Sequence, residues 1–370
     1  MNTPIPPTSS PGADLQVGLI GYGNAGRIFH APLIAGVPGL TLACICSSKP
    51  LAVQADWPLV RVVPTPEALL ADAAIEVVVI ATANDSHYGI ARAALLAGKH
   101  VVVDKPCTVT LAETEDLLAL AEARGRVLTV FQNRRLDADF LSLRAVLDDG
   151  RLGRLVHVES HFDRYRPVVP HRWRDQNQPG SGLWVDLGAH LADQAIQLFG
   201  VPDAILVDMA VQREGAVVND WFHAQMSFES RHPGLRVVLH GSALVPSVGP
   251  RWLVHGTRGS FIKQGMDPQE DALKAGRRPR LDALQDWGAD PATGETVVQE
   301  PVPGGPPDAF SRVSRPAPVV SGNYLRYYAN LRDHLRGQAA LMVSAREVRA
   351  VMQVLSVGEQ SAIERRWLPM

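Results

Sequence analysis

Short apolar runs alternate with helix-like segments over the first part of the chain. The apolar runs cover residues 15–20, 40–46, 77–81, 101–103 and 127–131, and the helix-like segments include 67–70, 87–97 and 111–124. Strands that are apolar along their whole length and separated by helices are typical of a parallel sheet buried on both faces. Gly98 and Gly125 follow two of these segments, at the position where glycine commonly ends a helix. The pattern predicts an α/β domain over residues 13–137.

After about Asp137 the pattern changes to alternation of apolar and polar residues, in 156–162 and in parts of 221–228 and 235–241. Alternation predicts strands with one solvated face, and therefore an open, mainly antiparallel sheet. A helix is predicted over 183–199, and 263–322 is rich in Pro, Gly and charge, which indicates long irregular excursions. We predict an α/β domain for substrate binding and oligomerisation over residues 138–322.

Two further helices are predicted near the end of the chain, over 324–336 and 345–364. We expect residues 323–370 to pack back on the first domain. An open sheet face usually finds a partner, so we expect a homodimer or a homotetramer.

Composition narrows the class of protein. Residues 1–12 are rich in Pro, Ser and Thr and lack the start of a signal peptide, so we predict a disordered tail. The formal net charge is −2 and there is no basic tract, which argues against nucleic acid or an anionic membrane as the main partner. No apolar run reaches the length of a membrane span, so we expect a cytoplasmic protein. Cys44, Cys46 and Cys107 are expected to be small buried hydrophobic residues. With no dense cluster of His, Cys and carboxylates, we predict no metal.

The first apolar run ends in a glycine-rich turn that opens a helix. Gly21 permits the tight turn, Gly23 lets backbone approach a pyrophosphate, and Gly26 lets the helix pack close to the sheet. The helix N-terminus then offers free N–H groups to phosphates. We therefore predict a Rossmann domain whose dinucleotide-binding loop is Gly21, Tyr22, Gly23, Asn24, Ala25 and Gly26.

The end of the second apolar run indicates which dinucleotide binds. An NAD-preferring site usually places Asp or Glu about 20 residues beyond the loop, on the ribose 2′-hydroxyl. Ser47, Ser48 and Lys49 stand there instead. Hydroxyls and an ammonium group favour a 2′-phosphate, so we predict NADP rather than NAD. The alternative is that the serines start a loop and Lys49 is solvated.

Two clusters could carry chemistry. Asp104-Lys105-Pro106 follows the fifth parallel strand, provided that a short strand precedes Pro64, and ligands bind outside such strand ends. By itself this could be a surface turn. The second cluster is Asp186 and His190, four residues apart on one face of a helix. An exposed ion pair is the ordinary explanation, but the apolar residues around them indicate a buried helix, which favours a catalytic role.

These features together resemble the Gfo/Idh/MocA family of glucose-fructose oxidoreductases, inositol dehydrogenases and rhizopine-catabolism proteins, from Leu15 onward. That family carries Glu-Lys-Pro, so Asp104 is a shortened variant. Further motifs resemble a subgroup with NADP-dependent scyllo-inositol dehydrogenases: Gln132-Asn133-Arg134-Arg135, Phe162-Asp163-Arg164-Tyr165-Arg166-Pro167, Arg172-Trp173-Arg174, the stretch from Asp186 to Gln194, the stretch from His255 to Lys263, and Gln269-Glu270-Asp271-Ala272-Leu273.

The resemblance implies roles for individual residues. It implies that Lys105 hydrogen-bonds the reacting oxygen, that His190 is the general acid/base, and that Asp186 holds His190 or a substrate hydroxyl. It also implies that the peptide bond before Pro106 is cis. The implied cofactor contacts beyond the glycine loop and the Ser47–Lys49 turn are Thr82, Asn84, His87, Asp104, Lys105, Asn133 and Arg134.

The chemistry is consistent with these roles, because alcohol oxidation needs a base for the O–H proton and a cation beside the developing alkoxide. We hypothesise an NADP-dependent oxidoreductase that interconverts a secondary alcohol and a ketone on a cyclic polyol or sugar, scyllo-inositol-like. The alternatives are a non-enzymatic dinucleotide-binding regulator, or the same chemistry on an aldose or a dihydrodiol. Candidate substrate contacts, any of which could instead be a salt bridge or a core aromatic, are His161, Asp163, Arg164, Tyr165, Arg166 and Trp173.

Overall fold

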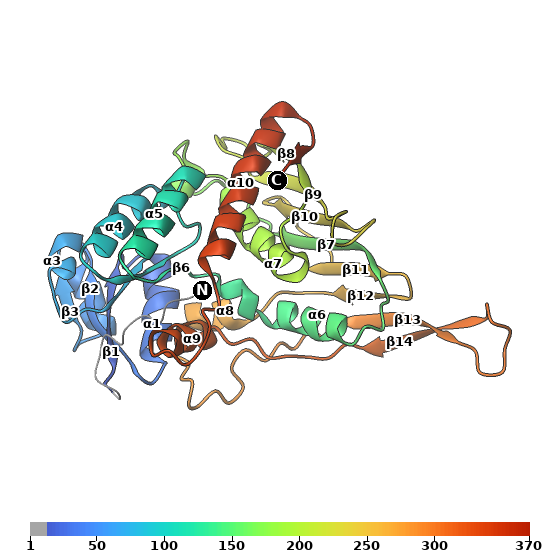
Figure 1. Cartoon of the computed structure of the whole chain (residues 1–370), viewed down its shortest axis with the longest axis horizontal. Helices are drawn as coiled ribbons and strands as arrows, with labels where there is room; N and C mark the ends of the chain where they lie inside the picture. Colours follow the sequence, from blue (N-terminus) through green and yellow to red (C-terminus); the bar gives the residue numbers. More distant parts are fainter. Residues whose placement is uncertain (1–12) are drawn as a thin grey trace. The chain divides into compact units, whose positions relative to one another are not determined.

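The computed structural model describes residues 13–370, so the tail predicted at residues 1–12 lies outside the described residues. Two compact units are present (Figure 1). The first comprises the described residues up to Asn133 together with 269–287 and 324–352. The second comprises 134–268, 288–323 and 353–370. No helix among residues 13–370 is both long and apolar enough to cross a membrane.

The first unit contains a six-stranded parallel sheet in the order β3-β2-β1-β4-β5-β6. The strands are β1 (Leu15–Ile20), β2 (Leu40–Cys46), β3 (Arg61–Val63), β4 (Val77–Ile80), β5 (His100–Val103) and β6 (Leu128–Val130). Continuous burial along β4 and β5 explains their unbroken apolar sequences. The predicted parallel α/β fold is confirmed. The short β3 ends just before Pro64, so β5 is the fifth strand in chain order, as expected.

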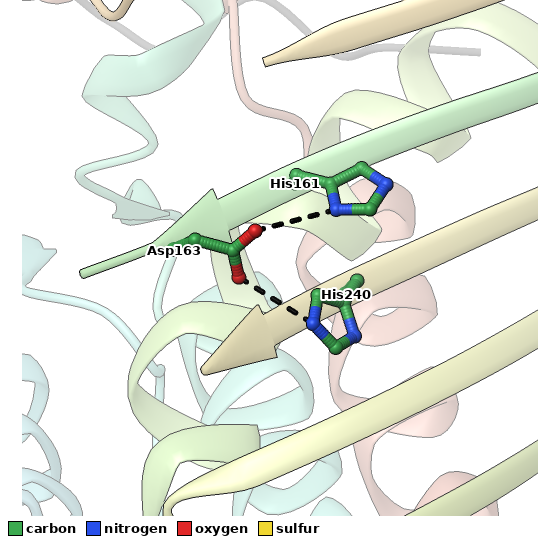
Figure 2. Close-up of side chains that lie close together, drawn as sticks. All are labelled: His161, Asp163 and His240. Carbon is green, nitrogen blue, oxygen red and sulfur yellow. Dashed lines mark ion pairs between the residues drawn. The ribbon is translucent and has the colours of Figure 1, made fainter. Parts of the chain in front are cut away.

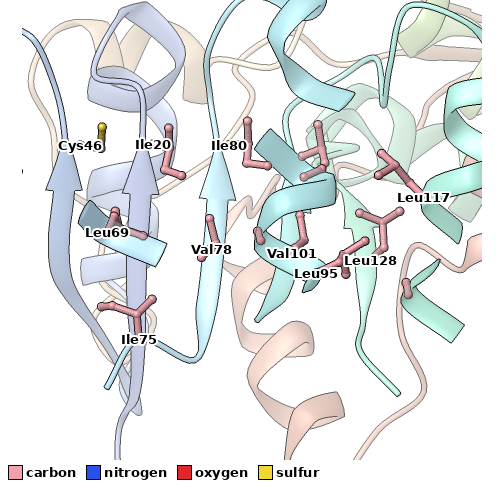
Figure 3. Close-up of a cluster of buried hydrophobic side chains, with 14 of the residues drawn as sticks. Ile20, Cys46, Leu69, Ile75, Val78, Ile80, Leu95, Val101, Leu117 and Leu128 are labelled. Carbon is pink, nitrogen blue, oxygen red and sulfur yellow. The ribbon is translucent and has the colours of Figure 1, made fainter. Parts of the chain in front are cut away.

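Helices α3 (Pro66–Leu70), α4 (Asn84–Leu96) and α5 (Leu111–Ala123) pack apolar side chains onto this sheet (Figure 3). Leu95 of α4 and Leu117 of α5 are fully buried against Val78 and Val101. Burying one such side chain contributes about 1.5–3 kcal/mol. Cys44 and Cys46 belong to the same cluster and, like Cys107, are buried and free, which confirms their prediction as small hydrophobic residues.

The remaining helices of the first unit are α1 (Ala31–Ala35), α2 (Pro50–Asp56), α8 (Gln269–Lys274), α9 (Leu325–Leu335) and the first part of α10 (Ala345–Glu364). Tyr328 of α9 makes a 2.5 Å hydrogen bond to Nδ1 of His30, which precedes α1. The Oγ1 of Thr129 in β6 donates to the backbone carbonyl of Val343. These contacts fasten the late segments of the chain to the parallel sheet of the unit.

The second unit is built on a nine-stranded open sheet in the order β14-β13-β12-β11-β7-β10-β9-β8-β15. Neighbouring strands are antiparallel except for β7 and β10, which confirms a mainly antiparallel sheet. Its strands are β7 (Leu155–Asp163), β8 (Ala204–Ala210), β9 (Trp221–Ser227), β10 (Arg236–Ser242), β11 (Trp252–Gly256), β12 (Gly259–Lys263), β13 (Glu295–Pro301), β14 (Phe310–Pro316) and β15 (Leu368–Pro369).

Alternating burial along β7 and β9 places one face of this sheet in the core and leaves the other half-exposed. The unit also contains α6 (Ala138–Asp148) and α7 (Ala189–Phe199). On α7, Asp193 forms a buried bidentate ion pair with Arg135, with N–O distances of 2.8 and 2.6 Å. Such a pair satisfies charges that could not be buried singly.

The expectation of irregular structure over 263–322 was wrong in part. That region holds α8 and the two strands β13 and β14, which pair with each other in antiparallel register. Most side chains of β14 are exposed, so the strand needs no apolar alternation. Backbone hydrogen bonds to a neighbouring strand stabilise it instead, and a pattern of side chains does not reveal them.

Candidate active site

The glycine loop follows β1 in the first unit. Gly21 has a φ of +99°, and a Cβ built there would lie 2.5 Å from the carbonyl oxygen of Ala81. A Cβ on Gly26 would lie 2.1 Å from the carbonyl oxygen of Gly21. At Gly23, in contrast, a Cβ would meet no atom within 4 Å. The fold itself therefore requires Gly21 and Gly26, whereas Gly23 leaves open space beside the backbone, as expected of a loop that receives a pyrophosphate.

The helix that follows begins with a π-helical segment, η1 (Ala25–His30), and continues as α1. The hydroxyl of Tyr22 donates a 2.8 Å hydrogen bond to Asp56 at the end of α2. Burial and this bond raise the pKa of Tyr22 well above its usual value. Arg27 also bonds Asp56, through Nε at 2.7 Å. Tyr22 and Arg27 thus anchor the loop to α2.

The turn after β2 carries the residues predicted to choose the dinucleotide. The N–H of Lys49 donates to Oγ of Ser47 at 3.0 Å, and the N–H of Ser47 donates to the carbonyl of Val63. Ser48 and Lys49 are exposed. Two hydroxyls and one ammonium group therefore stand at the end of β2, and the nearby carboxylate of Asp56 is engaged by Arg27.

His87 holds together the segments that follow β4 and β5. Its Nδ1 lies 3.0 Å from the carbonyl oxygen of Pro106, and its Nε2 lies 3.3 Å from that of Thr82. The residue is 0 % exposed, and burial lowers the pKa of its imidazole. His87 therefore lies between these two segments, and its contact with a cofactor stays a prediction. Thr82 is half-buried and Asn84 is buried at the first turn of α4.

The Asp104-Lys105-Pro106 segment directly follows β5. The Lys105–Pro106 peptide bond is cis, as the family resemblance implies. Oδ1 of Asp104 accepts a 2.8 Å hydrogen bond from the N–H of Lys105 and lies 3.9 Å from Nε2 of His30. Burial alone would raise the pKa of Asp104. The neighbouring His30 and Lys105 lower it by more than burial raises it, so the pKa of Asp104 lies below its usual value. The shorter carboxylate thus still anchors the half-buried Lys105.

Asn133 and Arg134 lie in η2 (Asn133–Leu136), and both side chains are buried. Nη1 of Arg134 donates a 3.1 Å hydrogen bond to Asp137, and its guanidinium lies 4.8 Å from the centre of the Phe162 ring. This ion pair gives Arg134 a structural role in the second unit. Contact of either residue with a cofactor stays a prediction.

The helix with Asp186 and His190 begins with a second π-helical segment, η4 (Trp184–Gly188), which continues as α7. Such segments are frequent at functional sites. The loop before it is held by Asn219, which accepts backbone hydrogen bonds from Leu183 and Trp184. His190 is buried, as expected. Asp186 is not: its side chain is 20 % exposed, because it turns toward Arg174, whose Nη1 lies 3.3 Å from its Oδ1.

A pocket in the second unit, the arginine pocket, includes Asp186 in its wall. It encloses about 470 Å³, part of which is open to solvent. Five arginines and three aspartates line it, so positive charges outnumber negative ones. They are Arg164, Arg166, Arg172, Arg174, Arg213, Asp175, Asp186 and Asp220. Arg213 is fixed by ion pairs to Asp220 at 2.9 Å and Asp175 at 3.4 Å, and Arg172 pairs with Asp175 at 2.8 Å. The wall is a preorganised set of hydrogen-bond donors.

The predicted substrate contacts separate into two groups. Arg164 and Arg166 line the arginine pocket, whereas Tyr165, between them, is 58 % exposed. His161 and Asp163 lie on the half-exposed face of β7, opposite the buried Phe162. Trp173 is not part of the pocket wall; its ring lies 5.3 Å from the guanidinium of Arg174.

The sequence prediction missed several pocket residues, among them Arg172, Arg174, Arg213 and Asn219. The density of arginines between 164 and 174 was a usable signal for the first two. Arg213 and Asn219 lie in the segment between β8 and β9, and no local pattern linked them to α7.

Both units match one family of known proteins. Residues 15–132 match the description "Oxidoreductase family, NAD-binding Rossmann fold", and residues 144–370 match "Oxidoreductase family, C-terminal alpha/beta domain". The chain belongs to the Gfo/Idh/MocA oxidoreductase family. This membership confirms the resemblance inferred from the motifs. It identifies the protein as an oxidoreductase with a domain for a nicotinamide dinucleotide and a small-molecule substrate.

Relatives within the family cover nearly the whole chain. An uncharacterized oxidoreductase of Escherichia coli is 50% identical over 96% of this chain and 98% of its own length. The scyllo-inositol 2-dehydrogenase (NADP(+)) of Bacillus subtilis is 37% identical over 95% of both chains. A solved structure from Yersinia pestis superposes with a TM-score of 0.88 at 46% identity, covering 97% of this chain and 98% of that one.

Proposed function

We propose that the protein is an NADP-dependent dehydrogenase that interconverts a secondary alcohol and a ketone on a cyclic polyol or sugar, scyllo-inositol-like. The observation that carries the proposal is the arginine pocket, which places Asp186 among fixed hydrogen-bond donors. A polyol presents many hydroxyl groups, and such a wall of guanidinium and carboxylate groups suits them. The Bacillus subtilis relative, an NADP-dependent scyllo-inositol dehydrogenase at 37% identity, supports the same substrate class.

The loop and turn of the first unit fit the proposed NADP. Open space at Gly23 receives the pyrophosphate, and Ser47, Ser48 and Lys49 bind the 2′-phosphate. When bound, the nicotinamide ring supplies the hydride acceptor or donor. We further propose Thr82 and Asn84 as cofactor contacts, with His87 as a positioning residue.

We further propose proton-handling roles for Lys105, His190 and Asp186. Lys105, anchored by Asp104, hydrogen-bonds the reacting oxygen and stabilises negative charge that develops on it. His190 takes the hydroxyl proton in oxidation and returns it in reduction. Asp186 orients His190 or a neighbouring substrate hydroxyl, and Arg174 in turn holds Asp186.

Steady-state assay tests the proposal, with NADP and NAD against inositols, aldoses and dihydrodiols. We expect polyol-dependent reduction of NADP, and losses of about 100-fold or more in kcat for Lys105→Met and His190→Asn. Lys274→Met, which removes an exposed lysine of α8, is the matched control and should keep full activity. The proposal fails if the wild type turns over no substrate of the panel, or if folded Lys105→Met keeps wild-type kcat.

The charge of the arginine pocket favours a second candidate substrate, a sugar acid. Excess positive charge in the wall would bind a carboxylate that a neutral polyol lacks. Uronates and aldonates in the same panel separate the two: a higher kcat/KM for the acid than for its neutral counterpart selects this class, and the reverse order selects the neutral polyol.

The half-exposed face of the open sheet favours assembly, and we propose a homodimer or homotetramer in the cytoplasm. Light scattering on the purified full chain measures the oligomeric state, and a mass equal to that of one chain would contradict it.

A further inference from the structure

Two histidines and an aspartate meet on the half-exposed face of the sheet in the second unit. His161 and Asp163 are on β7, and His240 is on β10, which pairs with β7 in parallel so that His240 is the register partner of His161. Figure 2 shows the three side chains pointing toward one another from the two strands. Each contributes one ligand atom, and these atoms lie within 4.8 Å of one another. Among residues 13–370, it is the one group of three His, Cys, Asp or Glu side chains with this spacing.

The distances within the group suit metal ligands better than hydrogen bonds. Asp163 Oδ2 lies 3.4 Å from Nδ1 of His161, and Asp163 Oδ1 lies 3.5 Å from Nε2 of His240. Hydrogen bonds between such groups are shorter, at about 2.7–2.9 Å. Ligands held at about 2.0–2.2 Å from one tetrahedral metal ion are separated by roughly 3.3–3.6 Å. Each imidazole therefore lies at such a separation from one oxygen of the Asp163 carboxylate, and the two rings face different oxygens.

Burial adds a second, independent observation. The side chain of Asp163 is only 8 % exposed, and its Oδ1 is buried without a hydrogen-bond partner among the described residues. Buried polar atoms normally have partners, and an exception calls for an unseen ligand, such as a water or an ion. A cation between the three side chains would satisfy the Asp163 oxygen.

Glu159 supplies the support that metal-binding histidines usually have. Its Oε2 lies 2.8 Å from Nε2 of His161, and its Oε1 lies 2.7 Å from Nε2 of His157. A carboxylate on the distal nitrogen fixes the ring so that Nδ1 faces the ion. His161 therefore has one nitrogen held by Glu159 and the other directed at Asp163.

We propose that His161, Asp163 and His240 bind one divalent first-row metal ion, Zn²⁺ in the simplest case, with water completing its coordination. Two imidazole nitrogens and one carboxylate favour such ions over Mg²⁺ and Ca²⁺, which prefer oxygen ligands. The ion would join β7 to β10. This site uses none of the residues proposed for hydride transfer.

The competing explanation is a charged histidine between two carboxylates. Burial alone would lower the pKa of His161, but Asp163 and Glu159 raise it by more than burial lowers it. A protonated His161 ring between these two carboxylates therefore also fits the distances. The two explanations differ in stoichiometry, because only the metal site takes up one ion per chain.

Metal titration of the full chain, purified without a histidine tag and stripped with a chelator, tests the proposal. We expect one Zn²⁺ per chain by calorimetry, a higher Tm with Zn²⁺ but not with Mg²⁺, and the visible absorption of low-coordinate Co²⁺ when Co²⁺ is added. Asp163→Asn and His240→Gln should each weaken Zn²⁺ binding at least tenfold, and Glu159→Gln should weaken it about 10- to 100-fold by removing the support.

His255→Gln is the matched control. His255 lies on the neighbouring β11, its Nδ1 bonds Oγ of Ser260 at 2.7 Å, and it is outside the three-residue group. It should bind Zn²⁺ as the wild type does. The proposal is overturned if the wild type takes up no stoichiometric Zn²⁺, or if folded His161→Gln, His240→Gln and Asp163→Asn all bind it as tightly as the wild type. Circular dichroism establishes which variants are folded.

Discussion

Nη1 of Arg174 lies 3.3 Å from Oδ1 of Asp186, and both residues line the arginine pocket. Because this guanidinium fixes the carboxylate that we propose to orient His190 or substrate, we predict that Arg174→Met lowers kcat/KM about fivefold. That corresponds to about 1 kcal/mol, the contribution of a good partly exposed ion pair. Steady-state kinetics with the best substrate measures it. Arg236→Met, which breaks an exposed pair with Glu229, is the control and should leave kcat/KM unchanged.

The glycine loop allows stability and binding to be separated. Gly26→Ala should reduce Tm strongly, because its Cβ would collide with the carbonyl oxygen of Gly21. Gly23→Ala should keep the wild-type Tm, because its Cβ would enter open space, yet weaken NADP binding at least tenfold. Thermal unfolding and fluorescence titration measure the two quantities. Equal NADP affinity in Gly23→Ala and the wild type would exclude the loop as the pyrophosphate site.

Lys49 gives a test of cofactor preference. We predict that Lys49→Glu lowers kcat/KM for NADP at least tenfold, since a carboxylate would repel the 2′-phosphate. The value for NAD should not fall, because NAD has no phosphate at that ribose position for the carboxylate to repel. The NAD assay therefore serves as the internal control. A parallel loss with both cofactors would show that Lys49 acts through the fold.

His100 predicts a pH dependence of stability. Its Nδ1 accepts a 3.0 Å hydrogen bond from the N–H of Val127, and burial together with the charge of Arg126 lowers its pKa to about 4. In the unfolded chain the His100 imidazole takes up a proton near pH 6.5, whereas in the folded protein it stays neutral down to about pH 4. Protonation therefore favours the unfolded chain, so the free energy of unfolding is highest above pH 6.5 and falls as pH drops toward 4. The loss amounts to about 3 kcal/mol at 1.36 kcal/mol per pH unit.

The variant His100→Asn keeps an acceptor for Val127 but cannot titrate. Urea unfolding at several pH values between 7 and 4 should show that its free energy of unfolding falls less steeply than that of the wild type. Parallel curves for the two proteins would mean that His100 is not the titrating group.

Periodic side-chain patterns predicted the parallel sheet closely. β1 and β2 begin and end at the predicted residues, because strands buried on both faces are apolar throughout. The exposed strand β14 was missed for the opposite reason, since its residues face solvent and only backbone pairing defines it.

The site was predictable where one motif supplies several residues and not where distant segments meet. The glycine loop and the cis Lys105–Pro106 bond follow from short motifs. Arg213 joins Asp175 only because the segment after β8 folds back toward η3 (Trp173–Asp175). His240 lies in a strand whose alternation was recognised, but its nearness to Asp163 depends on the parallel pairing of β7 with β10, which sequence spacing does not encode.

The buried ring of His87 lies between the carbonyl oxygens of Thr82 and Pro106, at 3.3 and 3.0 Å, and its single N–H donates to one of them. The proposed cofactor contact at Thr82 and the placement of Lys105 are therefore coupled within the first unit. Substitutions at Thr82 that are meant to alter cofactor binding will displace Lys105 as well, unless position 87 is varied at the same time. A library that varies Thr82 and His87 together, with Lys105 kept, should yield active variants that libraries of the single positions do not.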